Sequence, residues 1–171
     1  MNETLKTLTE RSSCNKFKPE LIKDEELDLI LKAGLNAPSG MNRQPQRFIV
    51  VRNKEMIQKL SAMNAAVMGA NTDPFYGAPE VVIVLVEKCN TGVEDGALAI
   101  GNMLNAAYSM GIGARWIHRA KEMFESKEGK ELLKEWGVEG DLQGVGCCIL
   151  GYPDMPLRTK EKIPGRVYYV D

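Results

Sequence analysis

The chain has 171 residues, 44% hydrophobic and 26% charged, a composition typical of one globular domain spanning residues 1–171. Its 22 basic and 23 acidic side chains give a net charge of -1, which disfavours a nucleic-acid binder or a polybasic membrane anchor. The start of the chain has no apolar run and the four cysteines form no C-x-x-C pair, so we expect a cytoplasmic protein with reduced thiols.

The first half of the chain alternates helical patterns with proline-rich or polar breaks. Acidic residues at 24–26 favour the start of a helix, and Leu27, Ile30, Leu31 and Leu35 continue it with helical spacing. Pro38, Gly40 and Pro45 end it. In chain order we expect a helix at about 3–11, a polar turn at 12–16, this helix from 24, a strand at 48–51, a helix at 55–66 and a loop at 71–79.

The second half contains the more strongly buried patterns. The continuous apolar run Val81–Val86 predicts a central strand. The segment Asp95–Met110 predicts a helix that is apolar almost all round, so we expect it to be buried in the core and to extend to a subunit interface. Further along we expect strands at 112–117 and 145–150, a helix at 127–136 and an edge strand in the tail at 167–170. This mixture predicts an α/β or α+β protein.

Several common catalytic motifs are absent. The sequence has no G-x-x-x-x-G-K-[ST], G-x-G-x-x-G, H-E-x-x-H or G-x-S-x-G pattern, which disfavours a P-loop NTPase, a Rossmann dinucleotide site and the corresponding hydrolases. His118 is the single histidine, so a histidine-rich metal centre is excluded and no metal site is predicted.

Three polar segments are candidates for ligand binding. Arg11, Ser12, Ser13 and Asn15 offer a guanidinium, hydroxyls and an amide that could hold a phosphate, although by themselves they fit a serine-rich helix end better. The loop at 37–45 places Ser39, Asn42 and Gln44 between prolines, and amides can bind the imide edge of a heterocycle; a structural turn is the alternative. In the tail, Arg158, Lys160 and Lys162 would point the same way in an extended segment, unless they are simply a solvated basic run.

A fourth candidate is Ile117-His118-Arg119, which follows the turn at Gly111-Ile112-Gly113. His118 could be a ligand, an acid or a capped surface histidine.

The order and spacing of these segments resemble the nitroreductase family of FMN enzymes. That family has R-x-S-x-[RK]-x-F, then A-P-S-x-x-N-x-Q-P-W before an F-I-V-V strand, then G-[LI]-G-x-x-W, G-Y-P and a basic tail. The chain has the corresponding segments at 11–17, 37–46, 48–51, 111–116, 151–153 and 160–164. The most specific of them is P-S-x-x-N-x-Q-P.

The resemblance implies an α+β fold with a central mixed sheet flanked by helices, and a homodimer formed through the long helices with FMN at its interface. It implies FMN contacts from Arg11, Ser12, Ser13, Asn15, Lys160 and Lys162, and from Pro38, Ser39, Gly40 and Asn42 of the second subunit. Asn71 is a further candidate contact, the backbone around His118 and Arg119 would lie near flavin N5, and Phe75 and Tyr76 would cover the acceptor unless they only pack the loop.

Two positions depart from the family pattern. Asn15 stands where Arg or Lys is usual, so one positive charge near the flavin is missing, and Arg43 or Arg47 is the candidate to replace it. Gln46 stands where Trp is usual, which should make that wall of the site more polar.

The activity implied is a ping-pong reaction in which NADH or NADPH reduces FMN and a nitroaromatic, quinone or similar electron-poor acceptor is then reduced. No side chain need act as a nucleophile, and His118 is the candidate proton donor. The alternatives are dehalogenation or flavin modification on the same fold, a flavin-binding redox protein without enzymatic activity, and a structural protein that has lost its cofactor.

Overall fold

The central feature of the computed structural model, which describes residues 1–170, is a four-stranded sheet in the order β1-β2-β4-β3. Its strands are β1 (Gln46–Val51), β2 (Glu80–Glu87), β3 (Gly113–Ile117) and β4 (Leu142–Gly151). All three pairings are antiparallel, so among residues 1–170 the sheet is not the mixed sheet that we expected. The fold is α+β, as the resemblance implied.

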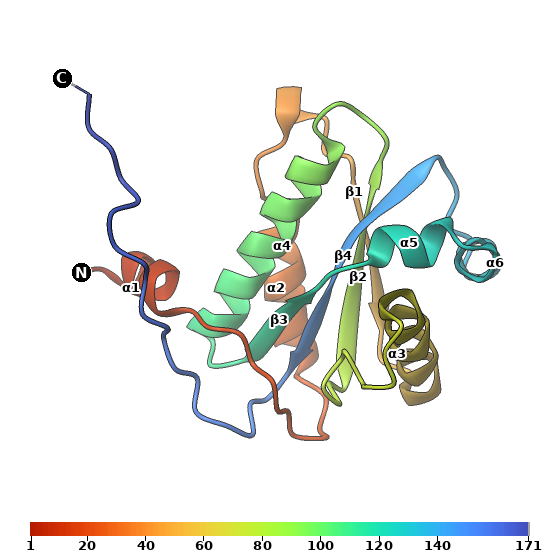
Figure 1. Ribbon diagram of the computed structural model, residues 1–171, viewed down its shortest axis with the longest axis horizontal. Helices are drawn as coiled ribbons and strands as arrows, with labels where there is room; N and C mark the ends of the chain where they lie inside the picture. Colours follow the sequence, from red (N-terminus) through yellow and green to blue (C-terminus); the bar gives the residue numbers. More distant parts are fainter. Residues whose placement is uncertain (171) are drawn as a thin grey trace.

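Helices cover both faces of the sheet (Figure 1). On one face, α2 (Asp24–Leu35) and α4 (Gly92–Ser109) pack against each other and against strand residues such as Val84 and Cys148. The other face is covered by α3 (Lys54–Met68), α5 (Ala120–Glu125) and α6 (Lys127–Glu135). The short helix α1 (Glu3–Glu10) contacts α4 at the edge of the molecule. Two apolar cores therefore enclose β2 and β4, as their uninterrupted apolar runs predicted.

Local sequence signals account for several helix ends. The side chains of Asn2, Asn53 and Ser126 each accept a hydrogen bond from a backbone N–H in the first turn of α1, α3 and α6. Helix α3 ends at Gly69, whose φ of 63° is readily adopted only by glycine.

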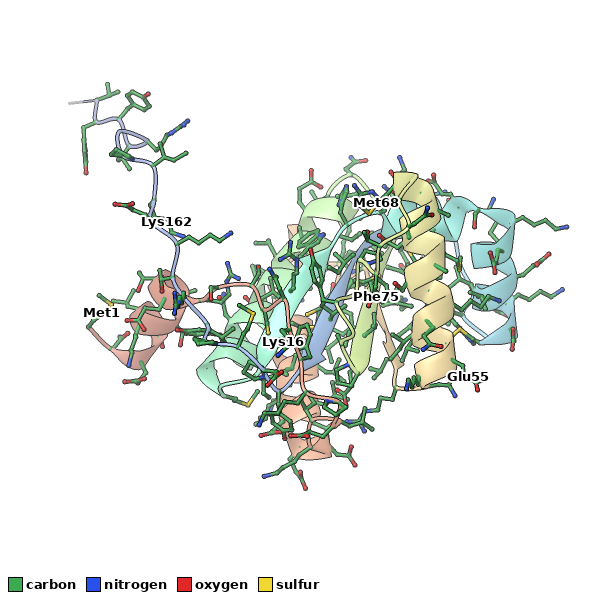
Figure 2. The ribbon with its side chains drawn as sticks, turned by 60° about the horizontal axis from the view of Figure 1, so that its bottom comes forward. Met1, Lys16, Glu55, Met68, Phe75 and Lys162 are labelled. Carbon is green, nitrogen blue, oxygen red and sulfur yellow. The ribbon has the colours of Figure 1, made fainter. Side chains whose placement is uncertain are left out.

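Two parts of the chain differ from the expectation. Helix α5 was not predicted, because six residues are too few to show a helical period. The tail at 167–170 forms no strand and is almost fully exposed, so the predicted edge strand is wrong for this chain on its own: no neighbouring strand pairs with it. Figure 2 shows the tail leaving the body of the molecule beyond Lys162. Within residues 1–170, none of the helices combines the length and apolar character needed to span a bilayer.

Candidate cofactor site

The N-terminal segment that carries Arg11 to Phe17 lies along the free edge of β3. The backbone N–H of Cys14 donates to the carbonyl of Ala114 at 3.0 Å, and Phe17 pairs with Pro153 just beyond β4. This approach requires Gly113, because a Cβ at that position would lie 2.8 Å from the Sγ of the buried Cys14. The glycine of the G-I-G segment thus has a steric role in building the site.

A cavity of about 480 Å³ opens beside this segment, and we call it the basic cavity. The tail closes its other side, and the Thr159 hydroxyl donates to the Glu10 carbonyl at the end of α1 at 2.9 Å. The structure therefore brings together the two candidate segments of residues 11–15 and 158–162. The basic cavity is lined by Arg11, Ser12, Ser13, Asn15, Arg115, Met155, Pro156, Arg158, Thr159, Lys160 and Lys162.

The electrostatic character of the basic cavity is uniformly positive. No carboxylate lines it, and none of its arginines and lysines belongs to an ion pair among the described residues. The Ser12 hydroxyl oxygen is buried without a hydrogen-bond partner within the described chain. A buried hydroxyl without a partner is costly, so this donor set suits an anionic ligand with several oxygen acceptors.

Arg115 is the charged residue of this cavity that the sequence analysis missed. It lies on β3, its guanidinium donates a hydrogen bond to the Asn15 side-chain oxygen, and its Cζ lies 4.7 Å from the centre of the Tyr76 ring. The signal available was the alternation of β3, in which Ala114 and Trp116 pack toward α4 while Arg115 and Ile117 point to the other face.

The loop at 38–42 lies elsewhere. Its Gly40 N–H donates to the buried carboxylate of Asp95 at 2.9 Å, which fixes the loop to the start of α4. Met41, Asn42 and Gln44 all have positive φ values near 55°, a strained conformation of a kind that is frequent at binding sites. Pro38, Ser39, Gly40 and Asn42 do not line the basic cavity of the same chain.

His118 and Arg119 form the turn between β3 and α5. The His118 side chain is exposed, while its carbonyl accepts a 2.7 Å hydrogen bond from the buried amide of Asn64 on α3. Arg119 has a φ of 77° and precedes α5. The turn is therefore fixed through its backbone, although neither residue lines the basic cavity.

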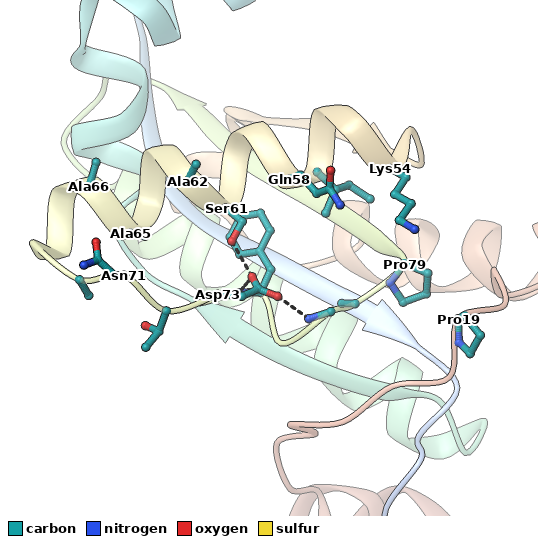
Figure 3. Close-up of a pocket in the computed structure, with 16 residues that line it drawn as sticks. Pro19, Lys54, Gln58, Ser61, Ala62, Ala65, Ala66, Asn71, Asp73 and Pro79 are labelled. Carbon is teal, nitrogen blue, oxygen red and sulfur yellow. Dashed lines mark hydrogen bonds between the residues drawn. The ribbon is translucent and has the colours of Figure 1, made fainter.

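A larger cavity of about 860 Å³, the α3 pocket, lies between α3 and the loop at 70–79 (Figure 3). Asn71 lines this pocket and not the basic cavity, so the structure does not bring it to Arg11. The pocket contains one cation, Lys54, and the carboxylate of Asp73, whose oxygens already accept bonds from Ser61, Phe75 and Gly77. It is less suited to an anion than the smaller basic cavity.

Phe75 and Tyr76 have different environments. Phe75 is fully buried in the core beneath α3, which favours the alternative of loop packing over a role as a cover for an acceptor. Tyr76 is 39% exposed and contacts Arg115, which places it at the border of the basic cavity.

The cysteines do not contribute to the site chemically. Burial raises the pKa of Cys147 and Cys148 to about 12 and also raises the pKa of Cys14. Thiols with raised pKa values are poor nucleophiles, and all four cysteines are unpaired.

The fold and the site together define the class of protein: an α+β protein in which an N-terminal segment, an edge strand and a basic tail enclose an anion-accepting cavity. Comparison with known proteins then identifies the family. Residues 8–83 match the model of the nitroreductase family, and the chain is 33% identical over 160 residues to a protein of Archaeoglobus fulgidus with the provisional name NADH dehydrogenase/NAD(P)H nitroreductase, covering 90% of this chain and 87% of that one. The chain belongs to the nitroreductase family.

Two further similarities bear on function. A crystal structure of a nitroreductase with bound FMN from Bacteroides fragilis has a TM-score of 0.91 and 30% identity, covering 100% of both chains. An iodotyrosine deiodinase of Thermotoga neapolitana is 26% identical over 175 residues, covering 90% of this chain and 89% of its own.

Proposed function

We propose that this protein is an FMN-dependent oxidoreductase that uses NADH or NADPH to reduce nitroaromatics, quinones or similar electron-poor acceptors. The observation that carries the proposal is the basic cavity, with its unpaired cations, its lack of carboxylates and the buried hydroxyl of Ser12. Membership of the nitroreductase family and the FMN-bound relative of the same fold support the choice of ligand.

The donor set of the basic cavity fits a flavin mononucleotide. Arg11, Lys160 and Lys162 supply charge for the phosphate, while the hydroxyls of Ser12 and Ser13 supply neutral donors for the phosphate and the ribityl chain. The side chain of Asn15 is suited to the pyrimidine edge, where both a donor and an acceptor are needed.

The second half of the site requires another copy of the chain. Pro38, Ser39, Gly40 and Asn42 lie on a loop that its own Asp95 holds rigidly, outside the basic cavity. We propose that in a homodimer this loop reaches the basic cavity of the second subunit. Asn71 lines the α3 pocket and not the basic cavity. We therefore propose no contact between Asn71 and an FMN bound in the basic cavity of the same subunit.

When bound, FMN supplies the redox chemistry: it accepts a hydride from NAD(P)H and passes two electrons to the acceptor. The protein positions the reactants. Although the turn of His118 and Arg119 does not line the basic cavity, we propose that its backbone, fixed through Asn64, lies near the flavin ring. The exposed His118 side chain is the candidate that donates a proton to the product. The nicotinamide and the acceptor would use one surface in turn, which corresponds to a ping-pong mechanism.

The decisive test is an anaerobic absorbance titration of the purified protein, first with FMN and then with NADH or NADPH. We expect FMN to bind and its visible absorbance to bleach with at least one nucleotide and to return when a quinone is added. Parallel lines in a double-reciprocal plot would support the ping-pong mechanism. A protein that binds no FMN would contradict the proposal, and bound FMN that neither nucleotide bleaches would favour a redox protein without this activity.

Reductive dehalogenation is the second candidate, because a relative of similar length is an iodotyrosine deiodinase. Halide release from iodotyrosine by the reduced protein, faster than its reduction of quinones, would favour this function over the first.

A further inference from the structure

We infer that Arg115 is a flavin-binding residue that supplies, from β3, the positive charge that the chain lacks at position 15. The inference rests on the proposed FMN site. In the sequence, Asn15 takes the place of a basic residue; in the fold, a guanidinium from a segment 100 positions away lies in hydrogen-bond contact with it.

The position of Arg115 follows from the register of the sheet edge. Because Cys14 donates to the carbonyl of Ala114, the neighbouring Asn15 and Arg115 are brought side by side. Arg115 lies on the edge strand, opposite Ile149 of β4, and its side chain is half-buried in the wall of the basic cavity. The guanidinium of Arg115 therefore lies in the wall of the basic cavity that the sheet forms, next to the side chain of Asn15.

Two contacts orient the guanidinium without neutralising it. Asn15 accepts one of its hydrogen bonds, and the face of the Tyr76 ring lies 4.7 Å from it. No carboxylate forms an ion pair with Arg115 among residues 1–170. A guanidinium has five N–H donors in one plane, so a single neutral acceptor leaves most of them available for a ligand.

Within one chain, neither compensating residue suggested by the sequence occupies this place. Arg47 pairs with Glu87 and lies on β1, at the opposite edge of the sheet. Arg43 belongs to the loop at 38–44 and does not line the basic cavity of its own chain. Since Lys160 and Lys162 lie on the tail with Arg158, Arg115 is the cation that the sheet itself contributes, next to the amide suited to the flavin pyrimidine.

A cation next to the flavin ring favours the redox state that carries more negative charge, whereas a cation at the phosphate affects both states equally. The test therefore compares the FMN dissociation constant and the two-electron midpoint potential of bound FMN in the wild type, Arg115→Gln and Arg115→Lys. The control is Arg47→Gln, which removes the same group from the far edge of the sheet.

We expect Arg115→Gln to weaken FMN binding roughly ten-fold or more and to lower the midpoint potential, by about 30 mV for every ten-fold preferential loss of affinity for the reduced form. Arg115→Lys should retain most of both quantities because it keeps the charge, and Arg47→Gln should match the wild type. In the double variant Asn15→Arg/Arg115→Gln, a cation returned at position 15 should restore the potential.

Other results would overturn the inference. If Arg115→Gln has the FMN affinity and midpoint potential of the wild type, Arg115 does not bind the flavin. If it binds FMN more weakly but has an unchanged potential, Arg115 contacts the phosphate and not the flavin ring. Equal effects of Arg115→Gln and Arg47→Gln would show a nonspecific charge effect. Failure of the wild type to bind FMN would instead overturn the proposed function itself. Thermal unfolding of each variant without FMN shows whether the fold is intact.

Discussion

At the scale of single residues, the turn after β3 depends on one buried amide. Asn64 has no exposed surface, and its Nδ2 donates both to the carbonyl of His118 at 2.7 Å and to the sulfur of Met123 at 3.2 Å. It thus joins α3 to the turn at 118–119 and to α5. The turn has no comparable side-chain bond of its own in the described chain, so its conformation depends on this contact.

We therefore expect Asn64→Leu to lower the free energy of unfolding by roughly 1–3 kcal/mol, because a carbonyl that was bonded in the interior loses its donor. Urea unfolding measures the change. Gln58→Leu is the matched control, since Gln58 is an exposed amide on the same helix, and its effect should stay within about 0.5 kcal/mol. Equal stability of Asn64→Leu and the wild type would contradict this role.

The same scale shows where sequence reasoning succeeds and where it cannot. Arg11 and Lys162 were chosen for their chemistry, and the fold does bring them to one cavity. Arg115 could not be chosen in this way, because its value lies in a contact with Asn15 and Tyr76 that only the sheet register creates. For Phe75 the sequence left two alternatives open, because an aromatic residue in a polar loop has the same sequence pattern whether it faces a ligand or the core.

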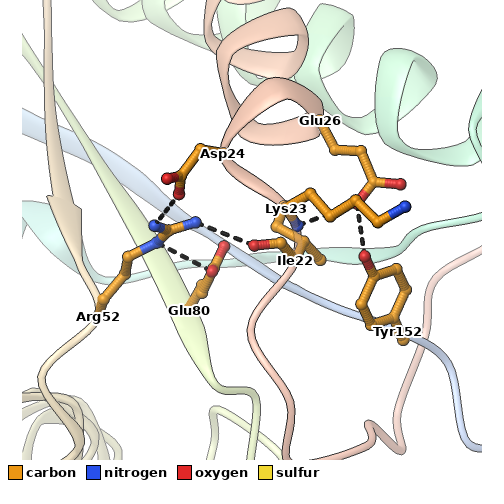
Figure 4. A network of polar contacts seen from close by, with 7 residues as sticks. All are labelled: Ile22, Lys23, Asp24, Glu26, Arg52, Glu80 and Tyr152. Carbon is orange, nitrogen blue, oxygen red and sulfur yellow. Dashed lines mark hydrogen bonds and ion pairs between the residues drawn. The ribbon is translucent and has the colours of Figure 1, made fainter.

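At the scale of elements, Arg52 forms ion pairs that join three of them (Figure 4). Arg52, just after β1, pairs with Asp24 at the start of α2 at 2.5 Å and with Glu80 at the start of β2 at 3.0 Å, and it donates to the Ile22 carbonyl at 3.1 Å. Glu80 has no exposed surface. A single guanidinium therefore holds the entry of α2 against the sheet.

Loss of this guanidinium should be costly, because it leaves the buried carboxylate of Glu80 without a counter-ion. We expect Arg52→Met to lower the free energy of unfolding by about 3–5 kcal/mol, measured by chemical denaturation near neutral pH. Arg47→Gln breaks an exposed pair with Glu87 and should cost no more than about 1 kcal/mol. Similar losses in the two variants would contradict the distinction.

Glu80 should also make stability depend on pH. Its burial raises its pKa above the ordinary 4.5, with Arg52 opposing the shift. Between the unfolded and the folded pKa the native state holds more protons than the unfolded state, so the free energy of unfolding should fall as pH rises through this window. In Glu80→Gln this fall should be absent. The measurement is the difference between the two unfolding curves from pH 4 upward, and a difference that does not change with pH would refute it.

Element boundaries followed from the sequence where the periodicity was long. The helix expected at 95–110 and the strand expected at 81–86 are present as α4 (Gly92–Ser109) and β2 (Glu80–Glu87), with every boundary within three residues of the expectation. Helix α5 was missed because it follows Arg119, which has a left-handed conformation, and has only six residues. An apolar pattern shows that a strand is buried, but it does not show which strand lies beside it or in which direction that strand runs. The mixed sheet was therefore predicted wrongly.

At the scale of the whole molecule, several leucines on three neighbouring helices are exposed. Leu98 of α4 is 49% exposed, Leu5 and Leu8 of α1 are 51% and 55% exposed, and Leu29 and Leu35 of α2 are each 55% exposed. These helices lie together on one side of the molecule (Figure 1). Exposed apolar side chains on neighbouring helices are candidates for an interface, and we expect a second copy of the chain to cover them.

These exposed leucines, and the loop at 38–42 that lies outside the basic cavity of its own chain, lead to one prediction about assembly. If the homodimer forms through α1, α2 and α4, then Leu98→Glu should place a charge in the interface. We expect this variant to be a monomer in size-exclusion chromatography with light scattering. Its FMN binding should be at least ten-fold weaker, because the 38–42 loop of the second copy is lost. Val67→Glu is the matched control: Val67 is 42% exposed on α3, on the other side of the sheet, and its variant should remain a dimer that binds FMN. A monomeric Leu98→Glu protein with wild-type FMN affinity would show that one chain holds the cofactor by itself, and the role given to Pro38, Ser39, Gly40 and Asn42 would then be wrong.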